Sequence, residues 1–213
     1  MNAKSAIKWY PSLQAYIKNL LEEGSLISKE RKEVLSLLAN YMAQKKMAGQ
    51  PVSLNFICTH NSRRSHISQI WAATAATYYK LGGIETFSGG TEATAFNPRA
   101  VAAMERAGFQ IKNPGGSNPH YEFSFSQEAP ALHCFSKTFD DPFNPKKDFA
   151  AIMTCSDADE NCPFISGAEW RLSLTYEDPK EADGTPEETE RYDERVRQIG
   201  REIFYAIHLL QSI

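Results

Sequence analysis

The sequence predicts a three-layer α/β fold, in which a parallel, twisted sheet carries helices on both faces and follows a helical extension. Short apolar strands alternate with helical segments through most of the chain, and this alternation is typical of parallel sheets. Residues 9–48, in contrast, show helical spacing only. We therefore expect a helical extension at 1–50 and one α/β domain at 51–213, with an insertion at about 112–148.

Two amphipathic helices are expected in residues 9–48. Apolar side chains recur at helical spacing, first at Leu13, Tyr16, Ile17, Leu20 and Leu21 and then at Val34, Leu35, Leu38, Tyr41 and Met42. Gly24 favours a helix end, and Ser28 is suited to cap the second helix. The pair either packs on the main domain or forms an arm that binds a partner, and the amphipathic pattern favours packing.

The α/β domain is expected to begin with the strand VSLNFI, after a break at Ala48-Gly49-Gln50-Pro51. The next expected elements are a helix over 64–80, a strand over 85–88 with a Gly89-Gly90 turn, and a helix from Asn97-Pro98 to Gly108. In the insertion, YEFSF and LHCFSKTF alternate as in a hairpin or an extended flap. FAAIMT and WRLSLTYEDP predict two more strands, and Thr185-Pro186-Glu187-Glu188 matches a capping box before a C-terminal helix.

Composition excludes several classes of protein. Hydrophobic residues make up 42% and charged residues 23%, as in globular proteins, and the net charge of -3 argues against a general nucleic-acid binder. No apolar run reaches membrane-spanning length and no secretory signal is evident, so we expect a cytoplasmic location without membrane contact. The four cysteines are too few for a disulfide framework and lack zinc-site spacing, so we expect no metal site.

The segment ICTHNSRRSHISQ places a cysteine between an apolar strand and the start of a helix. A loop in this position can direct backbone N–H groups and the positive end of the helix dipole at an anion. We expect the oxyanion to be bound by Thr59, His60, Asn61, Ser62, Arg63 and Arg64. The same field favours the thiolate of Cys58, and Ser65 can donate to its sulfur. The alternative, a buried thiol beside solvated arginines, is weakened by the position between strand and helix.

FICTHNSRRS resembles the signature of low-molecular-weight tyrosine phosphatases and of thioredoxin-coupled arsenate reductases, which share one fold. SGGTEATAFNPRAVAAMERAGFQI resembles the next strand, turn and helix of that family. The resemblance covers roughly 52–111 and 149–205, and it implies that Cys58 is the nucleophile, that the loop to Arg64 binds an oxyanion and that Ser65 assists the thiolate. Asp178-Pro179 resembles the family's acid loop, which implies a general acid at Asp178, although an Asp-Pro pair also suits an ordinary turn.

The segment TCSDADENCPF resembles the redox segment of the reductases. It implies that Cys58 attacks arsenate, that Cys155 forms a disulfide with Cys58 as arsenite leaves, and that Cys162 receives the oxidation. No bound cofactor is implied, and thioredoxin or a similar dithiol would supply electrons. If SDADEN is helical, the two cysteines lie about 10 Å apart along the helix axis. That helix must therefore unwind, because a disulfide needs Cα atoms within about 7 Å.

Two other functions remain open at this point. In a protein tyrosine phosphatase, phosphate esters would be hydrolysed through a phosphocysteine, and Cys155 and Cys162 would be incidental. Lys180 weakens this alternative, because tyrosine phosphatases usually carry an aromatic residue after the Asp-Pro pair. The other possibility is a non-enzymatic oxyanion sensor whose N-terminal helices bind a partner, and the set of nucleophile, arginine and acid argues against it.

The sequence departs from the family at several positions. Arg63 stands where a second cysteine is common, and Gln69 stands where some reductases use an acidic residue to bind potassium, so we expect no potassium site. The aromatic insertion can cover the active site as a lid or extend the sheet edge. Cys134 is either a buried thiol, which we favour, or an extra resolving thiol. The physiological oxyanion, the electron donor and the oligomeric state do not follow from the sequence.

Overall fold

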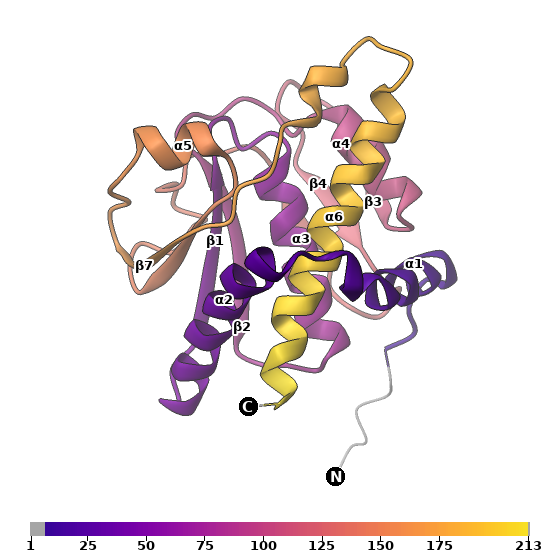
Figure 1. Cartoon of the computed structure of the whole chain (residues 1–213). Coiled ribbons are helices and arrows are strands. Elements are labelled where there is room, and N and C mark those ends of the chain that lie inside the picture. Colours follow the sequence, from indigo (N-terminus) through magenta and orange to yellow (C-terminus); the bar gives the residue numbers. More distant parts are fainter. Residues whose placement is uncertain (1–6, 213) are drawn as a thin grey trace.

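The computed structural model describes residues 7–212, and its main sheet has four strands in the order β2-β1-β6-β7. The strands are β1 (Val52–Cys58), β2 (Ile84–Gly90), β6 (Phe149–Met153) and β7 (Ala168–Ser173). Every neighbouring pair in this sheet is parallel. The predicted parallel sheet is confirmed, and the carboxyl ends of all four strands therefore lie along one edge, where the cysteine loop begins (Figure 1).

Helices cover both faces of this sheet, as the sequence predicts. On one face α3 (Arg64–Tyr78) packs on β1 and β2, and α6 (Glu188–His208) packs on α3 and on α4 (Pro98–Arg106). On the other face α5 (Ser156–Asn161) contacts β1 and β6. No helix between residues 7 and 212 is long and apolar enough to cross a membrane.

The two faces of the sheet form two apolar cores because side chains alternate along a strand. In β6, Ala150 and Ile152 join the large core under α3 and α6, whereas Phe149, Ala151 and Met153 join a small core with α5. All of β1 and β6 is buried, which explains why both sequences are almost continuously apolar. The small core contains Cys58 and Cys155, and Cys162 packs against it.

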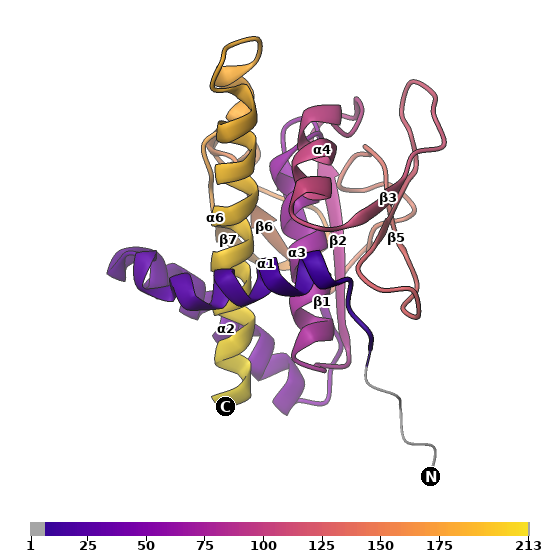
Figure 2. The same cartoon turned by 90° about the vertical axis from the view of Figure 1, so that its right-hand side faces the viewer.

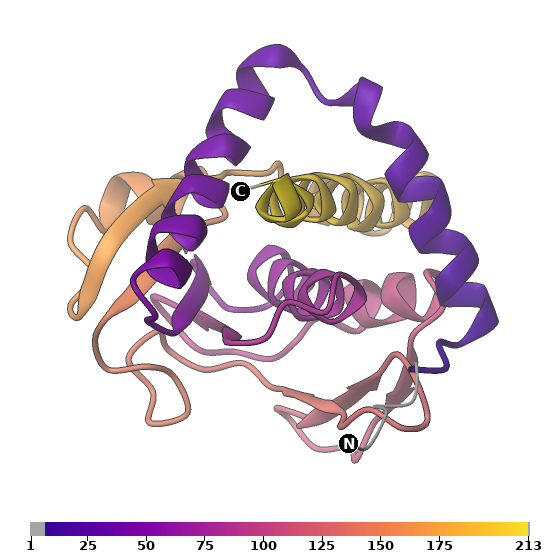
Figure 3. The same ribbon diagram turned by 90° about the horizontal axis from the view of Figure 1, so that it is seen from below.

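The N-terminal segment forms α1 (Pro11–Glu22), a 3-10 turn η1 (Glu23–Leu26) and α2 (Lys29–Met47), which confirms the two expected helices. Ser28 caps α2, since its hydroxyl accepts a hydrogen bond from Arg31 N at 3.1 Å. Figure 3 shows the two helices arching around α6. Most of the apolar residues predicted to face the domain belong to the large core, but Leu21 is 39% exposed. Gly200 of α6 allows a close approach because a Cβ there would lie 2.9 Å from both Leu20 and Trp71. The helices thus pack on the main domain, as we favoured.

The insertion forms a second, antiparallel sheet in the order β3-β4-β5. Its strands are β3 (Gln110–Lys112), β4 (Tyr121–Ser124) and β5 (Leu132–Cys134). Figure 2 shows this sheet on the side of the molecule away from α6. The segment that follows β5 meets the main sheet at a bridge between Thr138 and Gly90 of β2. The insertion is therefore a separate small sheet whose return segment runs beside the end of β2.

Two local predictions were wrong. Gly89 and Gly90 do not form a turn but end β2, paired with Ile57 and Cys58. A Cβ at Gly90 would lie 2.7 Å from Asn61 N, so the close passage of the cysteine loop requires glycine there.

The capping box was also placed too early. Helix α6 begins at Glu188, after a 3-10 turn η2 (Pro179–Ala182), and a further 3-10 turn η3 (Leu209–Ser212) follows the helix. The hydroxyl of Thr185 donates backwards to Ala182 O at 2.9 Å instead of capping the helix. The Glu188 carboxylate accepts from Gly184 N at 2.7 Å, because the chain turns before the helix begins.

Candidate active site

The candidate nucleophile, Cys58, ends β1 at the floor of the loop formed by residues 59–63. Only 4% of its surface is exposed, and its Sγ lies 3.1 Å from Ser65 Oγ in the first turn of α3. The local fold follows from the sequence, because a fully buried strand stops at the cysteine and the next helix starts at Arg64. The thiol thus faces a helix N-terminus, which carries partial positive charge.

Asn61 fixes both the shape of the loop and the direction of the Ser65 hydrogen bond. Its backbone is in the left-handed region (φ 44°), which asparagine tolerates better than most residues. The side-chain oxygen accepts from Lys137 N at 3.0 Å, and Nδ2 donates to Ser65 Oγ at 2.8 Å. Because the Ser65 hydroxyl accepts from Asn61, its single proton is free to donate to the Cys58 sulfur.

Arg64 connects the cysteine loop with the expected acid. Its Nη1 donates to Tyr176 O at 2.8 Å and its Nη2 donates to Asp178 Oδ2 at 2.7 Å. The Nε atom is buried and has no hydrogen-bond partner among residues 7–212. This N–H is therefore a donor available to an oxyanion held in the loop. The structure thus brings Cys58, Arg64 and Ser65, which are close in sequence, together with Asp178 from a distant segment of the chain.

Arg63 has different neighbours, although it is next to Arg64 in sequence. Its Nε donates to Tyr192 OH at 3.0 Å, and its guanidinium lies 3.8 Å from Asp178 Oδ1 and 3.9 Å from Asp183 Oδ2. Burial raises the pKa of Tyr192 to about 12, and its hydroxyl donates to Asp183 at 2.8 Å. The side chain of Arg63 thus joins the loop to α6.

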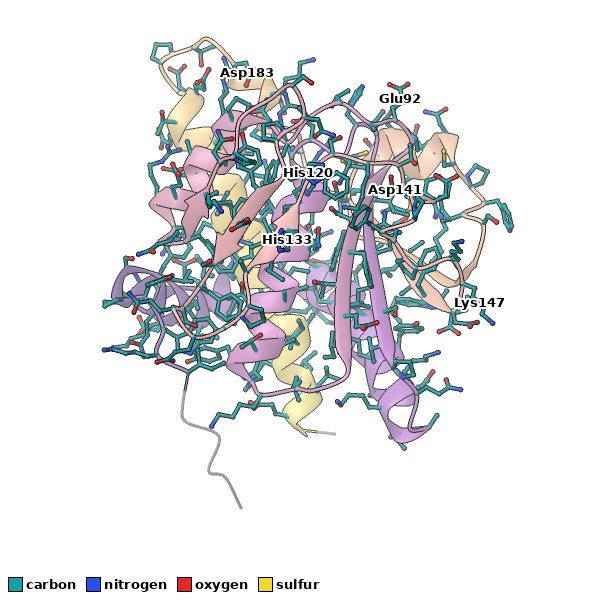
Figure 4. The ribbon with its side chains drawn as sticks, turned by 180° about the vertical axis from the view of Figure 1, so that it is seen from behind. Glu92, His120, His133, Asp141, Lys147 and Asp183 are labelled. Carbon is teal, nitrogen blue, oxygen red and sulfur yellow. The ribbon has the colours of Figure 1, made fainter. Side chains whose placement is uncertain are left out.

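The outer part of the loop faces the solvent at this end of the molecule. His60 has a half-exposed side chain 3.7 Å from Glu92. Figure 4 shows Glu92 and Asp183 on opposite sides of the same end of the molecule, so residues 60–63 lie between two carboxylates. Ser62 O accepts from Asn97 N at 2.8 Å, which ties the loop to the start of α4.

Thr59 links the loop to the redox segment. Its hydroxyl donates to Asp157 Oδ2 at 2.7 Å and lies 3.4 Å from Cys155 Sγ. Strands β1 and β6 are neighbours with Ile57 opposite Met153, so the two strands deliver Cys58 and Cys155 to adjacent positions at the sheet edge. The redox cysteine expected to attack Cys58 is therefore beside the loop.

The helix α5 separates Cys155 from Cys162, as the sequence allowed. Cys155 caps its N-terminus, where Sγ accepts from Ala158 N at 3.4 Å, and Cys162 is the residue after its last turn. At 1.5 Å per residue the two cysteines lie about 10 Å apart along the helix axis, so a disulfide between them requires α5 to unwind. Asp159 ties this helix to β7 through an ion pair with Arg171 at 2.5 Å and a hydrogen bond from Ser173.

Cys134 lies elsewhere. It is fully buried in the large core, and burial raises the pKa of its thiol to about 12. The favoured interpretation, a buried structural thiol, fits these surroundings better than a resolving role.

Lys137 is a residue that the sequence did not single out. Only 5% of it is exposed, burial lowers its pKa, and its ammonium lies 4.6 Å from the Phe135 ring centroid. Burial also lowers the pKa of nearby His66, with the Lys137 charge acting in the same direction. The contributions of Lys137 and Tyr176 to the site pass through main-chain N and O atoms, which no side-chain pattern reveals.

Among the residues that the structure describes, no group of three or more His, Cys, Asp or Glu side chains could hold a metal ion. Gln69, at the position where some reductases have an acidic potassium ligand, donates through Nε2 to Thr86 O at 3.1 Å. The Gln69 amide is neutral and already hydrogen-bonded, so it does not supply the negative charge of an acidic potassium ligand.

Comparison with known proteins gives relatives in sequence and in structure. No family model matches the chain. The chain is 30% identical over 149 residues to an arsenate reductase of Bacillus subtilis strain 168, covering 70% of this chain and 89% of that protein. It is 31% identical over 154 residues to an arsenate reductase of Bacillus licheniformis, covering 71% and 91%.

In structure, a low-molecular-weight phosphotyrosine phosphatase from Vibrio cholerae O395 aligns with a TM-score of 0.50 and 15% identity, covering 75% of this chain and 97% of that one. At this identity the similarity concerns the fold alone, and it agrees with the sheet order and helix layers described above.

Proposed function

Because this chain belongs to the arsenate reductase family of the low-molecular-weight phosphatase superfamily, we propose that it reduces arsenate to arsenite by means of Cys58, Cys155 and Cys162. The observation that carries the proposal is the grouping of these three cysteines in and beside one small core, next to the anion loop. A phosphatase needs Cys58 alone. Reduction requires two electrons, and a set of neighbouring thiols can supply them.

The first step is substitution at arsenic. The Cys58 thiolate attacks arsenate held by the loop N–H groups and Arg64, and an As–S bond forms. An arsenate oxygen departs as water after it takes a proton from Asp178, whose carboxyl adjoins the Arg64 fork. Positive charge from Arg64 and the helix N-terminus stabilises the anion throughout this step.

The second step is the reduction. The Cys155 thiolate attacks Cys58 Sγ, a disulfide forms between them, and the As–S electron pair stays on arsenic, which leaves as arsenite. The Cys162 thiolate then attacks Cys155 Sγ, so that the Cys58 thiolate is released and the Cys155–Cys162 disulfide remains. An external dithiol of the thioredoxin kind restores both thiols. We also propose a cytoplasmic location, since a reducing compartment keeps such a relay active.

Single-turnover chemistry tests this order of events. The reduced protein is mixed with excess arsenate without a reductant, arsenite is counted, and disulfides are mapped by non-reducing peptide mass spectrometry. The unsubstituted chain should give one arsenite and a Cys155–Cys162 disulfide. Cys162→Ser should give one arsenite and stop at Cys58–Cys155, whereas Cys155→Ser should give no arsenite from this relay.

Cys134→Ala is the matched control, because this thiol is buried in the other core and should leave turnover unchanged. Phosphate in place of arsenate should form no disulfide. If Cys155 and Cys162 stay reduced in arsenate while an aryl phosphate is hydrolysed through Cys58, the chain is a phosphatase and the relay is wrong.

A further inference from the structure

Helix α2 of the N-terminal extension reaches the segment that carries Asp178. The Arg31 guanidinium makes two hydrogen bonds there: Nε donates to Glu202 Oε2 at 2.7 Å and Nη2 donates to Thr175 O at 3.1 Å. The same guanidinium lies over the Tyr176 ring, 4.7 Å from its centroid. One side chain therefore joins α2, α6 and the segment between β7 and Asp178.

Arg64 holds the same segment from the active-site side. It donates to Tyr176 O and to Asp178, so Arg31 and Arg64 bind the carbonyl groups of two consecutive residues, Thr175 and Tyr176. Tyr176 N donates to Thr154 O at 3.1 Å, which fixes the segment against the end of β6. A displacement of this short stretch moves both the acid and the arginine fork.

The contact made by Arg31 is buried enough to be well defined. Tyr176 is 5% exposed and Glu202 is 3% exposed, while the Arg31 side chain is 21% exposed. Glu202 Oε1 accepts from Gln198 at 3.2 Å, so the carboxylate is oriented from α6 as well. A buried carboxylate needs a cationic partner, and here Arg31 supplies it.

We propose that Arg31 is a positioning residue for the chemistry at Cys58, which makes the N-terminal extension part of the catalytic unit. The proposal rests on the proposed function for its kinetic form. Reacting groups must be held to within fractions of an ångström, and a misplacement of about 1 Å can cost about 100-fold in rate. Without Arg31, residues 175–178 lose their tie to α2, although Arg195 of α6 still contacts Glu177 at 3.3 Å. Arg64 and Asp178 then occupy the productive arrangement less often.

Arg31→Ala tests the proposal, with Lys45→Ala as the matched control. Lys45 also ties α2 to the α/β domain, through an ion pair with Glu169 of β7 at 2.7 Å, but it does not touch residues 174–178. The kcat for arsenate should fall about tenfold in Arg31→Ala, while KM changes less because the loop N–H groups still bind the anion. Lys45→Ala should keep kcat within about twofold.

The conservative variant Arg31→Lys keeps a positive charge beside Glu202, so it tests whether the planar guanidinium itself is required. A lysine cannot bridge Glu202 and Thr175 O with a planar fork, so kcat should recover only in part. A merely structural role predicts a different result, in which Arg31→Lys and Lys45→Ala lower kcat to the same extent whenever their thermal stabilities match. That result overturns the proposal.

Amide hydrogen exchange and phosphate binding separate this proposal from the proposed function. If the unsubstituted chain does not reduce arsenate, the proposed function fails, but Arg31 can still be tested. In Arg31→Ala the Tyr176 amide should exchange at least tenfold faster than in Lys45→Ala. The Arg31→Ala variant should also bind inorganic phosphate more weakly than Lys45→Ala does. Unchanged exchange at Tyr176 together with unchanged phosphate binding would show that Arg31 does not position this segment.

Discussion

At the scale of single residues, the hydrogen bonds that lead to Cys58, the proposed nucleophile, form one directed path. Lys137 N donates to Asn61, Asn61 donates to Ser65, and the Ser65 hydroxyl is left to donate to Cys58. The direction matters because a hydroxyl has one proton, and an acceptor role toward Asn61 commits that proton to the sulfur. Loss of either the Asn61 or the Ser65 side chain should therefore affect the hydrogen bond to Cys58 in the same way.

Ser65→Ala should lower kcat/KM for arsenate by about 10- to 100-fold, since a hydrogen bond to a charged group contributes about 1.5–3 kcal/mol. Asn61→Ala should act largely through the same contact, so the double substitution should cost little more than Ser65→Ala alone. Steady-state kinetics of the single and double variants measure whether the two losses in kcat/KM add. The control is Ser68→Ala in the same helix, whose hydroxyl bonds only to Arg64 O. Fully additive losses would show that the two side chains act independently.

Residue spacing predicted part of this site and missed part of it. Cys58, Arg64 and Ser65 are close in sequence, so a strand followed by a helix is enough to bring them together. The backbone carbonyl of Tyr176 comes from a segment more than 100 residues away, and main-chain groups are the same in every residue type. Such contacts become visible only when the chain is folded.

At the scale of elements, α5 is a short helix that the proposed chemistry requires to unwind. Asp159 restrains it through the ion pair with Arg171 and the hydrogen bond from Ser173 of β7. Two of its acidic residues lie in the first turn, where they favour the helix through the dipole. The helix is therefore stable at rest and short enough to open at a modest cost.

Asp159→Ala should speed formation of the Cys155–Cys162 disulfide several-fold, because it removes the tie to β7 and the helix then opens more often. To measure the rate, the reduced protein is oxidised with a mild disulfide reagent, the reaction is quenched at successive times, and the disulfides are mapped. Glu160→Ala is the control, since Glu160 is an exposed residue of the same helix with no hydrogen bond or ion pair to any residue from 7 to 212. An oxidation rate equal to that of the control would mean that opening of α5 does not limit the step.

The elements themselves followed from apolar spacing, but their ends did not. The sequence predicted α6 correctly as a helix and placed its start at a capping box, whereas the Thr185 hydroxyl bonds to Ala182 O. The local sequence Gly89-Gly90 predicts a turn, yet both glycines belong to the end of β2, where the cysteine loop passes close to the strand. In both cases contacts with other segments outweighed the local preference.

At the scale of the whole molecule, the N-terminal helices complete the large core. Tyr16 of α1 stacks on Trp71 of α3 at 5.8 Å, and Leu20 lies against Gly200 of α6. The alternation of strands and helices predicted the fold class, since it depends on spacing along each element. The place where the extension packs could not be predicted, because many surfaces of an α/β domain can accept an amphipathic pair.

A chain that begins at residue 51 should lose the native fold, because deletion of α1 and α2 exposes apolar surface on α3 and α6. Six fully buried side chains of the extension carry most of this contact: Leu13, Ile17, Leu20, Leu35, Leu38 and Met42. Each such side chain contributes about 1.5–3 kcal/mol as an upper estimate, and the sum is comparable with a total stability of about 5–15 kcal/mol. Tryptophan fluorescence and calorimetry should therefore show one cooperative transition in the full chain and an aggregating or weakly ordered species in the shortened one. A shortened chain that stays monomeric and unfolds at the same temperature as the full chain would show that the extension does not stabilise the fold.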